Sequence, residues 1–129
     1  AIELLRETGP LAVSSANVSG NPPAQTAAQA KEQLGEDKVE AYEYNLGGNG
    51  KSQILGTTGF IKLVREKDGP IVGFHAIGKR ISEQIGEGQL IVNWEAYPED
   101  VAQFVHAHPT QNEALGEAAM GLAGIPLHG

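Results

Sequence analysis

The chain has 129 residues, which is enough for one domain with a buried core, and it carries a formal net charge of -7. This negative charge argues against nonspecific binding of nucleic acid, because the phosphates would be repelled. The sequence holds no Cys, so it has no disulfide framework, thiolate nucleophile or Cys-based metal site, and no apolar run approaches the roughly 20 residues of a membrane span.

The first part of the chain predicts two helices separated by a strand and a loop. In order, these are a helix at 2–7, a strand at Leu11–Ser15, a loop at 17–25 and a helix at 26–34. Thr26 and Gln29 form the capping-box pattern that opens the second helix, and Gly35 closes it.

The middle of the chain predicts a strand followed by a β-hairpin. The strand runs from Val39 to Leu46 and ends at the run GGNG. Apolar residues then alternate between Phe60 and Arg65, and Ile71–Ile77 forms the returning strand. Asp68-Gly69 between them is the strongest local turn signal in the sequence.

The last part predicts three helices. Ile77, Ile81 and Ile85 recur at four-residue spacing, which indicates a helix of about four turns that continues to Trp94. Two further helices are expected, a short one that starts at Pro98 and carries Val101, Phe104 and Val105, and a last one at about 111–123. We therefore expect a single α+β domain over residues 1–129, with a small antiparallel or mixed sheet packed against helices.

Three further motifs are weak. Residues 47–52, GGNGKS, suggest a phosphate-binding loop, but Asn45 stands where the pattern needs Gly, and we expect a strand after it instead of a helix. His106 and His108 form a His-x-His pair, but two imidazoles without a nearby carboxylate or third His do not complete a zinc site, so no metal is predicted. Ser14 and Ser15 lie in no nucleophile elbow.

His108 and Glu113 form the sharpest candidate site. A carboxylate bound to one ring nitrogen fixes the tautomer of a histidine and raises the basicity of the other nitrogen, which suits a general base. Thr110 and Glu113 are also spaced as a capping box, in which Glu113 would accept from the backbone amide of Thr110. Both roles stay open, because a carboxylate has two oxygens.

From about Lys31 to His128 the chain resembles the C-terminal interface (dimerisation) domain of dihydrolipoamide dehydrogenase, a flavin-dependent disulfide oxidoreductase. The residues that carry the resemblance are the run from Glu40 to Gly78, the run from Ile85 to Ala118, which contains the motif HAHPTxxEA, and the end LAGIPLH. The resemblance implies that His108 is the acid–base catalyst beside a redox dithiol, that Glu113 orients it, and that the His108–Pro109 bond is cis. It also implies a two-fold dimer in which the histidine reaches the flavin site of the partner.

Residues 3–30 instead resemble an internal segment of the threonylcarbamoyl-AMP synthase family. The segment SSANVSG at 14–20 carries this likeness, which implies that Ser15 and Asn17 belong to a nucleotide-binding motif. Both families have a Thr-capped, alanine-rich helix here, so the junction is expected within Thr26–Lys31.

These two likenesses predict a chimera, engineered or selected, that joins a synthase-derived part (residues 1–30) to a dehydrogenase-derived part (residues 31–129). We expect no enzymatic activity and no cofactor, so that His108, Glu113, Ser15 and Asn17 are vestigial. The expected partner is a second copy in a homodimer, with no nucleic acid and no membrane, and the parent families indicate a cytoplasmic location. Two alternatives remain, a natural interface-domain fragment acting as an interaction module and a weak nucleotide binder using Ser15-Ala16-Asn17.

Overall fold

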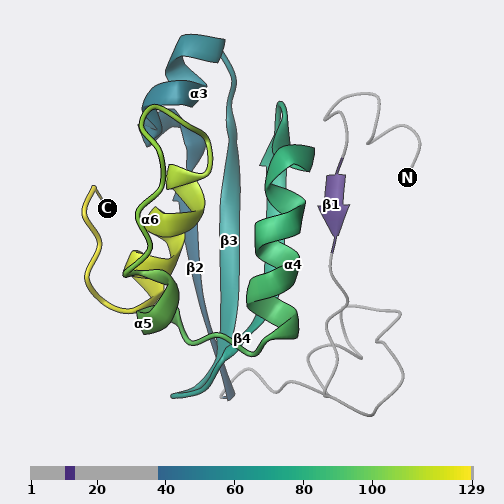
Figure 1. Ribbon diagram of the computed structural model, residues 1–129, viewed down its shortest axis with the longest axis vertical. Helices are drawn as coiled ribbons and strands as arrows, with labels where there is room; N and C mark the ends of the chain where they lie inside the picture. Colours follow the sequence, from purple (N-terminus) through teal and green to yellow (C-terminus); the bar gives the residue numbers. More distant parts are fainter. Residues whose placement is uncertain (1–10, 14–37, 129) are drawn as a thin grey trace.

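A four-stranded antiparallel sheet with the strand order β1-β4-β3-β2 forms one layer of the protein in a computed structural model (Figure 1). The structure describes residues 11–13 and 38–128. The strands are β1 (Leu11–Val13), β2 (Val39–Asn45), β3 (Gly59–Glu66) and β4 (Ile71–Gly78). The helical segments are η2 (Leu46–Gly48), α3 (Gly50–Leu55), η3 (Ile81–Gln84), α4 (Ile85–Asn93), α5 (Pro98–Val101) and α6 (Glu113–Leu122).

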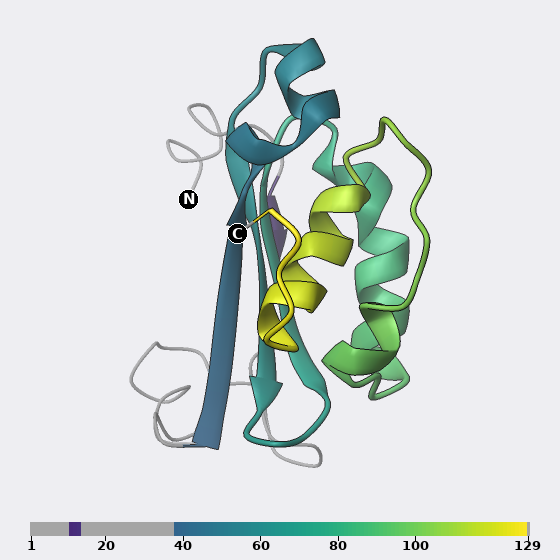
Figure 2. The ribbon, with the colours of Figure 1, turned by 90° about the vertical axis from the view of Figure 1, so that its left-hand side faces the viewer.

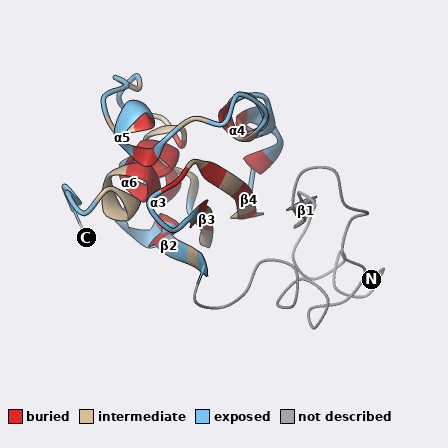
Figure 3. Cartoon of the chain, turned by 90° about the horizontal axis from the view of Figure 1, so that it is seen from below, coloured by how far each residue is buried: buried red, intermediate tan, exposed pale blue. Residues whose placement is uncertain are grey.

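The helices α4, α5 and α6 cover one face of this sheet, as Figure 2 shows. Alternation along β3 and β4 directs Ile61, Leu63, Phe74 and Ala76 into the space beneath the helices, where they are almost fully buried. The facing side of α6 consists mainly of small residues, which allows close packing, and its buried members are Ala114, Leu115, Ala118 and Ala119. Figure 3 shows the buried residues gathered between the two layers. The expected α+β class, with an antiparallel sheet packed against helices, is confirmed.

The β3–β4 hairpin follows the sequence prediction closely. The predicted strands Phe60–Arg65 and Ile71–Ile77 differ from β3 and β4 by one residue or less at each end. At the predicted turn Asp68 adopts a positive φ of 57°, and the amide of Gly69 donates to the carbonyl of Glu66 at 2.9 Å. The register shifts between Val64 and Arg65, where the pairing contains an irregularity.

Strand β1 pairs with the outer edge of β4. Leu11 lies opposite Ile77 and Val13 opposite His75 in an antiparallel register. The strand predicted at Leu11–Ser15 is thus confirmed over its first three residues, and Ser14 and Ser15 lie outside the described residues. The helices predicted at 2–7 and 26–34 lie outside them as well.

Three sequence predictions are wrong. A six-residue helix, α3, follows the glycine-rich run where a strand was expected, because the Asn49 side chain caps it by accepting from the amide of Ser52. Ile77 lies in β4, which ends at Gly78, and does not begin a helix, so its four-residue spacing to Ile81 spans a strand end and not a helical turn.

The third error concerns the helix that begins at Pro98. It ends at Val101, and Phe104 and Val105 lie beyond it as exposed residues. Among the described residues no helix has the length and apolar character needed to cross a bilayer.

Candidate functional site

Glu113 makes both of its predicted contacts at once. It is the first residue of α6, and its Oε1 lies 2.9 Å from Nδ1 of His108 in the preceding loop. Its Oε2 accepts from the backbone amide of Thr110 at 2.9 Å. Only half of the predicted capping box forms, because the Thr110 hydroxyl donates to the carbonyl of Ala107 at 2.6 Å and the N-cap residue is Asn112.

The electrostatics favour an ionised Glu113 beside a histidine that is open to solvent. Burial raises the pKa of Glu113, but the Thr110 amide and the His108 ring outweigh this effect, and the pKa lies below its usual value. Nδ1 of His108 can therefore donate to the carboxylate, which leaves Nε2 as the basic nitrogen of the neutral ring. The side chain of His108 is 77% exposed, so a group that docks from outside the domain could exchange a proton with it.

Helix α3 and its N-cap residue, Asn49, hold the loop that carries His108 in place. The side-chain amide of Asn49 donates to the carbonyl of Thr110 at 3.0 Å, and that of Gln111 donates to the Ser52 hydroxyl at 3.2 Å. The His108–Pro109 bond is cis, as the family resemblance implied. The glycine-rich segment thus supports the His108 loop.

The same segment provides no phosphate cradle, although a helix does follow it. The Asn45 side chain accepts from the amide of Gly47 at 2.8 Å, and that of Asn49 accepts from the amide of Ser52 at 2.9 Å. Two of the amides that would hold a phosphate are therefore already bound. The described residues do not fit the pyrophosphate of a dinucleotide cofactor at this point.

His106 makes a second histidine–carboxylate pair, which the sequence analysis missed. Its Nε2 lies 2.6 Å from Oε1 of Glu87 on α4, and the other oxygen of Glu87 accepts from Asn112 at 3.0 Å. The Glu87 hydrogen bond raises the pKa of His106 despite burial of the ring. Burial raises the pKa of Glu87, but the hydrogen bonds from His106 and Asn112 outweigh it and lower the pKa overall. Nineteen residues separate the partners, and no spacing rule connects them.

The two histidines of the His-x-His pair thus each contact a different carboxylate, Glu87 for His106 and Glu113 for His108. A carboxylate does lie beside each ring, contrary to the expectation from sequence. No group of three or more His, Cys, Asp or Glu within the described ranges could hold a metal ion.

A third pair joins α6 to the C-terminal tail. Oε1 of Glu117 lies 2.5 Å from Nδ1 of His128, and Oε2 accepts from the backbone amide of His128 at 3.3 Å. Glu117 is buried, and it lies one helical turn after Glu113 on α6. This four-residue spacing was the sequence signal that could have identified Glu117 as a second carboxylate on the same helix face. Ser15 and Asn17 lie outside the described residues, so their nucleotide-binding role stays a prediction.

A family model described as the pyridine nucleotide-disulphide oxidoreductase dimerisation domain matches residues 25–119. Curated relatives include the dihydrolipoyl dehydrogenase of Corynebacterium glutamicum, which is 38% identical over 101 residues, covering 77% of this chain and 22% of that protein. A dihydrolipoyl dehydrogenase of Bacillus subtilis is 40% identical over 105 residues, covering 80% of this chain and 22% of that protein. The chain thus spans about a fifth of the length of these relatives.

The crystal structure of LpdA from Mycobacterium tuberculosis has a similar fold. It matches with a TM-score of 0.67 over 94% of this chain and 28% of that chain, at 19% identity. At this identity the likeness shows the fold alone.

Proposed function

Because the chain belongs to the pyridine nucleotide-disulphide oxidoreductase dimerisation domain family, we propose that it is a self-association module that forms a homodimer. The observation that carries this proposal is a set of large apolar side chains left in solvent on the helix-bearing side. This helix-side apolar set consists of Leu90, Trp94, Phe104 and Val105. Contiguous exposed apolar surface is typical of protein–protein interaction sites.

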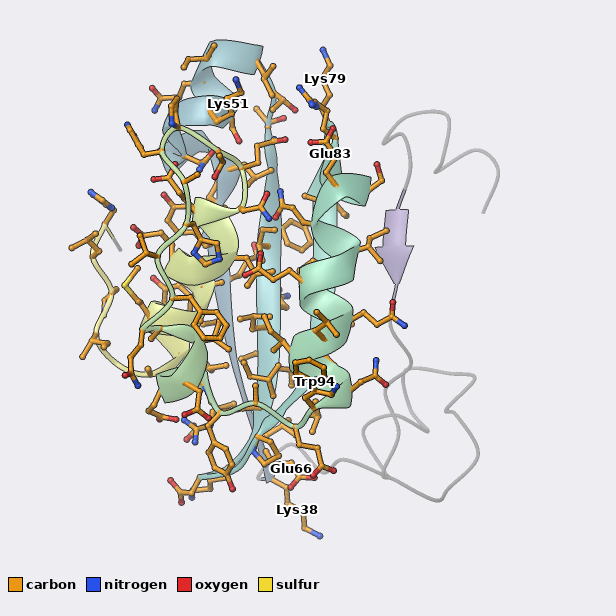
Figure 4. All side chains as sticks on the ribbon, viewed as in Figure 1. Lys38, Lys51, Glu66, Lys79, Glu83 and Trp94 are labelled. Carbon is orange, nitrogen blue, oxygen red and sulfur yellow. The ribbon has the colours of Figure 1, made fainter. Side chains whose placement is uncertain are left out.

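The members of the set come from two segments that lie against each other. Leu90 and Trp94 belong to α4 and its C-terminal cap, and Phe104 and Val105 belong to the segment that joins α5 to α6. The His106–Glu87 pair fastens this segment to α4. Trp94 is 76% exposed and Val105 is 98% exposed, and Figure 4 shows Trp94 at one end of α4. A second copy would remove these side chains from water.

Sedimentation equilibrium tests the proposal. We expect a dimer for the unaltered chain and a loss of dimer for Trp94→Glu and Val105→Glu, because a charge would be buried without a partner. Ile54→Glu is the matched control, since Ile54 is 69% exposed on α3 and outside the set. A monomer at high concentration, or equal dissociation of the control, would contradict the proposal.

We also propose that the 129 residues alone catalyse no redox reaction. They span 22% of the length of the Corynebacterium glutamicum and Bacillus subtilis dihydrolipoyl dehydrogenases compared above, and they contain no Cys to form a redox dithiol. His108 and Glu113 would then be a retained acid–base pair, in which Glu113 also accepts from the backbone amide of Thr110. Reduction of lipoamide by NADH, or a yellow flavin colour in the purified protein, would be evidence against this.

For the origin of the chain we propose an engineered or selected junction of two families, with a synthase-derived segment over residues 1–30. The family match begins at residue 25, next to the expected junction at Thr26–Lys31. A natural genome that encodes residues 1–129 in one reading frame would contradict an engineered origin and leave the dimerisation proposal intact.

A further inference from the structure

Residues 102–109 form the α5–α6 linker, which depends on one side chain for its attachment to the helix layer. Between Ala102 and Thr110 every residue except His106 is exposed, and the side chain of His106 is only 11% exposed. Figure 2 shows this linker on the outside of the helix layer. Because Phe104 and Val105 belong to the linker, half of the helix-side apolar set depends on how firmly His106 is held.

His106 attaches the linker to both neighbouring helices. Its Nε2 lies 2.6 Å from Oε1 of Glu87 in the first turn of α4, and its ring packs against Gly116 of α6. The other oxygen of Glu87 accepts from Asn112 at 3.0 Å, which fixes the orientation of the carboxylate. The charged groups that face the ring are the carboxylates of Glu87 and, from the start of α6, Glu113.

Both carboxylates favour a positive charge on His106. The hydrogen bond with Glu87 raises the pKa of His106, burial of the ring opposes this rise, and the charges of Glu87 and Glu113 add to it. Residues 81–129 contain no Lys or Arg, so histidine is the only kind of side chain in this part of the chain that can supply a positive charge. A proton on His106 therefore strengthens its contact with Glu87.

We propose that the His106–Glu87 contact is a proton-controlled latch, which holds Phe104 and Val105 in the helix-side apolar set and thereby regulates the affinity of the dimer. This role rests on the homodimer proposed above. With the proton in place the contact is a charge-assisted hydrogen bond, and without the proton only a weaker neutral bond remains. An unlatched linker must be ordered again before a second copy can bind, which weakens association.

The direction of the pH effect follows from the latched state. The pKa of His106 is raised above its usual 6.5, so the contribution of the latch is fully present below pH 6.5 and is lost as pH rises through the raised value. The pKa of Glu87 is lowered below its usual 4.5, so its carboxylate remains ionised throughout this range. The dimer should therefore be tighter in mildly acidic than in alkaline solution.

Sedimentation equilibrium of the full chain at about pH 6 and about pH 9 tests the latch. A concentration of about 0.5 M NaCl screens the repulsion between copies, whose net charge also changes with pH, but screens a half-buried pair much less. A charge-assisted hydrogen bond exceeds a neutral one by about fivefold in an equilibrium constant, and a symmetric dimer contains two latches. We therefore expect Kd to rise by about five- to thirtyfold from the acidic to the alkaline sample.

Two variants separate the latch from other titrating groups. His106→Gln keeps a donor near the position of Nε2 and does not titrate between these pH values, so its Kd should change by less than about twofold. His128→Gln is the matched control, because it removes another histidine–carboxylate contact, with Glu117, on the C-terminal tail and outside the linker. This control should retain the full pH effect of the unaltered chain.

A monomeric variant measures the latch without the dimer. In Trp94→Glu, which is expected to be monomeric, NMR relaxation of the Val105 methyl groups should show a more mobile linker at about pH 9 than at about pH 6. An equally ordered Val105 at both pH values would overturn the latch, and an undiminished pH effect on Kd in His106→Gln would overturn its role in the dimer. If the unaltered chain is monomeric at every pH, the homodimer fails together with the regulation of its affinity, while the Val105 measurement still decides whether the linker is latched.

Discussion

His106 is held between two helices by one hydrogen bond and one close packing contact. Its ring reaches Glu87 on α4, and a Cβ built on Gly116 of α6 would lie 2.8 Å from Nδ1 of the ring. Only a glycine at position 116 leaves room for the imidazole. The residue therefore connects α4 to α6 through a titratable contact, and protonation should influence the stability of the helix layer.

This contact predicts a pH dependence of stability. The pKa of His106 is raised above its usual 6.5, so its contribution is fully present below pH 6.5 and is lost as pH rises through the raised value. The pKa of Glu87 is lowered below its usual 4.5, so its contribution is present above pH 4.5 and is lost as pH falls through the lowered value. The pair should therefore stabilise the fold most between pH 4.5 and 6.5.

Urea unfolding from acidic to alkaline pH measures this effect as the difference between the unaltered chain and His106→Asn. The comparison with a variant is needed because His75 also titrates. Burial, and after it the nearby Lys62, lowers the pKa of His75, so that its protonation destabilises the fold as pH falls. We expect the difference in unfolding free energy to shrink as pH rises above 6.5. A difference that stays constant with pH would show that the pair adds no titratable stability.

Glu113 and His108 should differ sharply in their effect on stability. Glu113→Ala removes the acceptor of the backbone amide of Thr110, in the loop before α6, and should lower the unfolding free energy by about 1 kcal/mol. His108→Ala affects an exposed ring and should cost less than about 0.5 kcal/mol. Chemical denaturation measures both, and Glu113→Gln, which keeps an acceptor oxygen, is the control. Equal losses for the two alanine variants would mean that the imidazole itself is structural.

At the level of elements, α4 packs tightly against a side chain of β4 at Gly88. A Cβ built on Gly88 would lie 2.6 Å from Cδ1 of the buried Phe74 ring on β4, whereas one built on Gly86 meets nothing within 4 Å. Gly88→Ala should therefore cost about 1–3 kcal/mol through overpacking. Gly86→Ala should instead raise the free energy of unfolding by about 0.5–1 kcal/mol, because Ala has a higher helix propensity than Gly. Thermal unfolding of the two variants measures both changes. Melting temperatures that shift in the same direction for both would contradict the packing described for α4.

Strand β1 protects the outer edge of β4, which leads to a prediction for truncated chains. Removal of residues 1–13 takes away the three paired residues and should cost about 2 kcal/mol, while removal of residues 1–10 leaves them in place. The longer truncation also exposes an unpaired strand edge and should aggregate more readily. Urea midpoints and soluble yield compare the two truncations. Identical behaviour would indicate that β1 contributes nothing to the sheet.

The elements that could be predicted from sequence are those whose signal is local. The β3–β4 hairpin has alternating apolar residues and Asp68-Gly69, and Glu113 lies three residues after Thr110, so spacing alone was sufficient. Helix α3 has six residues, too few for a periodic pattern, and it depends on the Asn49 cap. Contacts between distant segments, such as Glu87 with His106, could not be predicted because the fold alone brings them together.

At the level of the whole molecule, charge opposes the association that the apolar surface favours. Two copies of a chain with a net charge of -7 repel each other, and this repulsion is screened by salt. The helix-side apolar set contains no charged side chain, so its burial does not depend on ion pairs that salt would weaken. Raising NaCl from about 0.02 to about 0.5 M should therefore tighten the dimer, by roughly two- to tenfold in Kd.

Unfolding of a dimer is linked to protein concentration, which provides the second measurement. The melting temperature of the unaltered chain should rise with concentration, and the rise should begin at lower concentration in high salt. Trp94→Glu should give a melting temperature that is independent of concentration at either salt level, because it unfolds as a monomer. If salt instead weakens association of the unaltered chain, opposite charges and not the helix-side apolar set hold the two copies together.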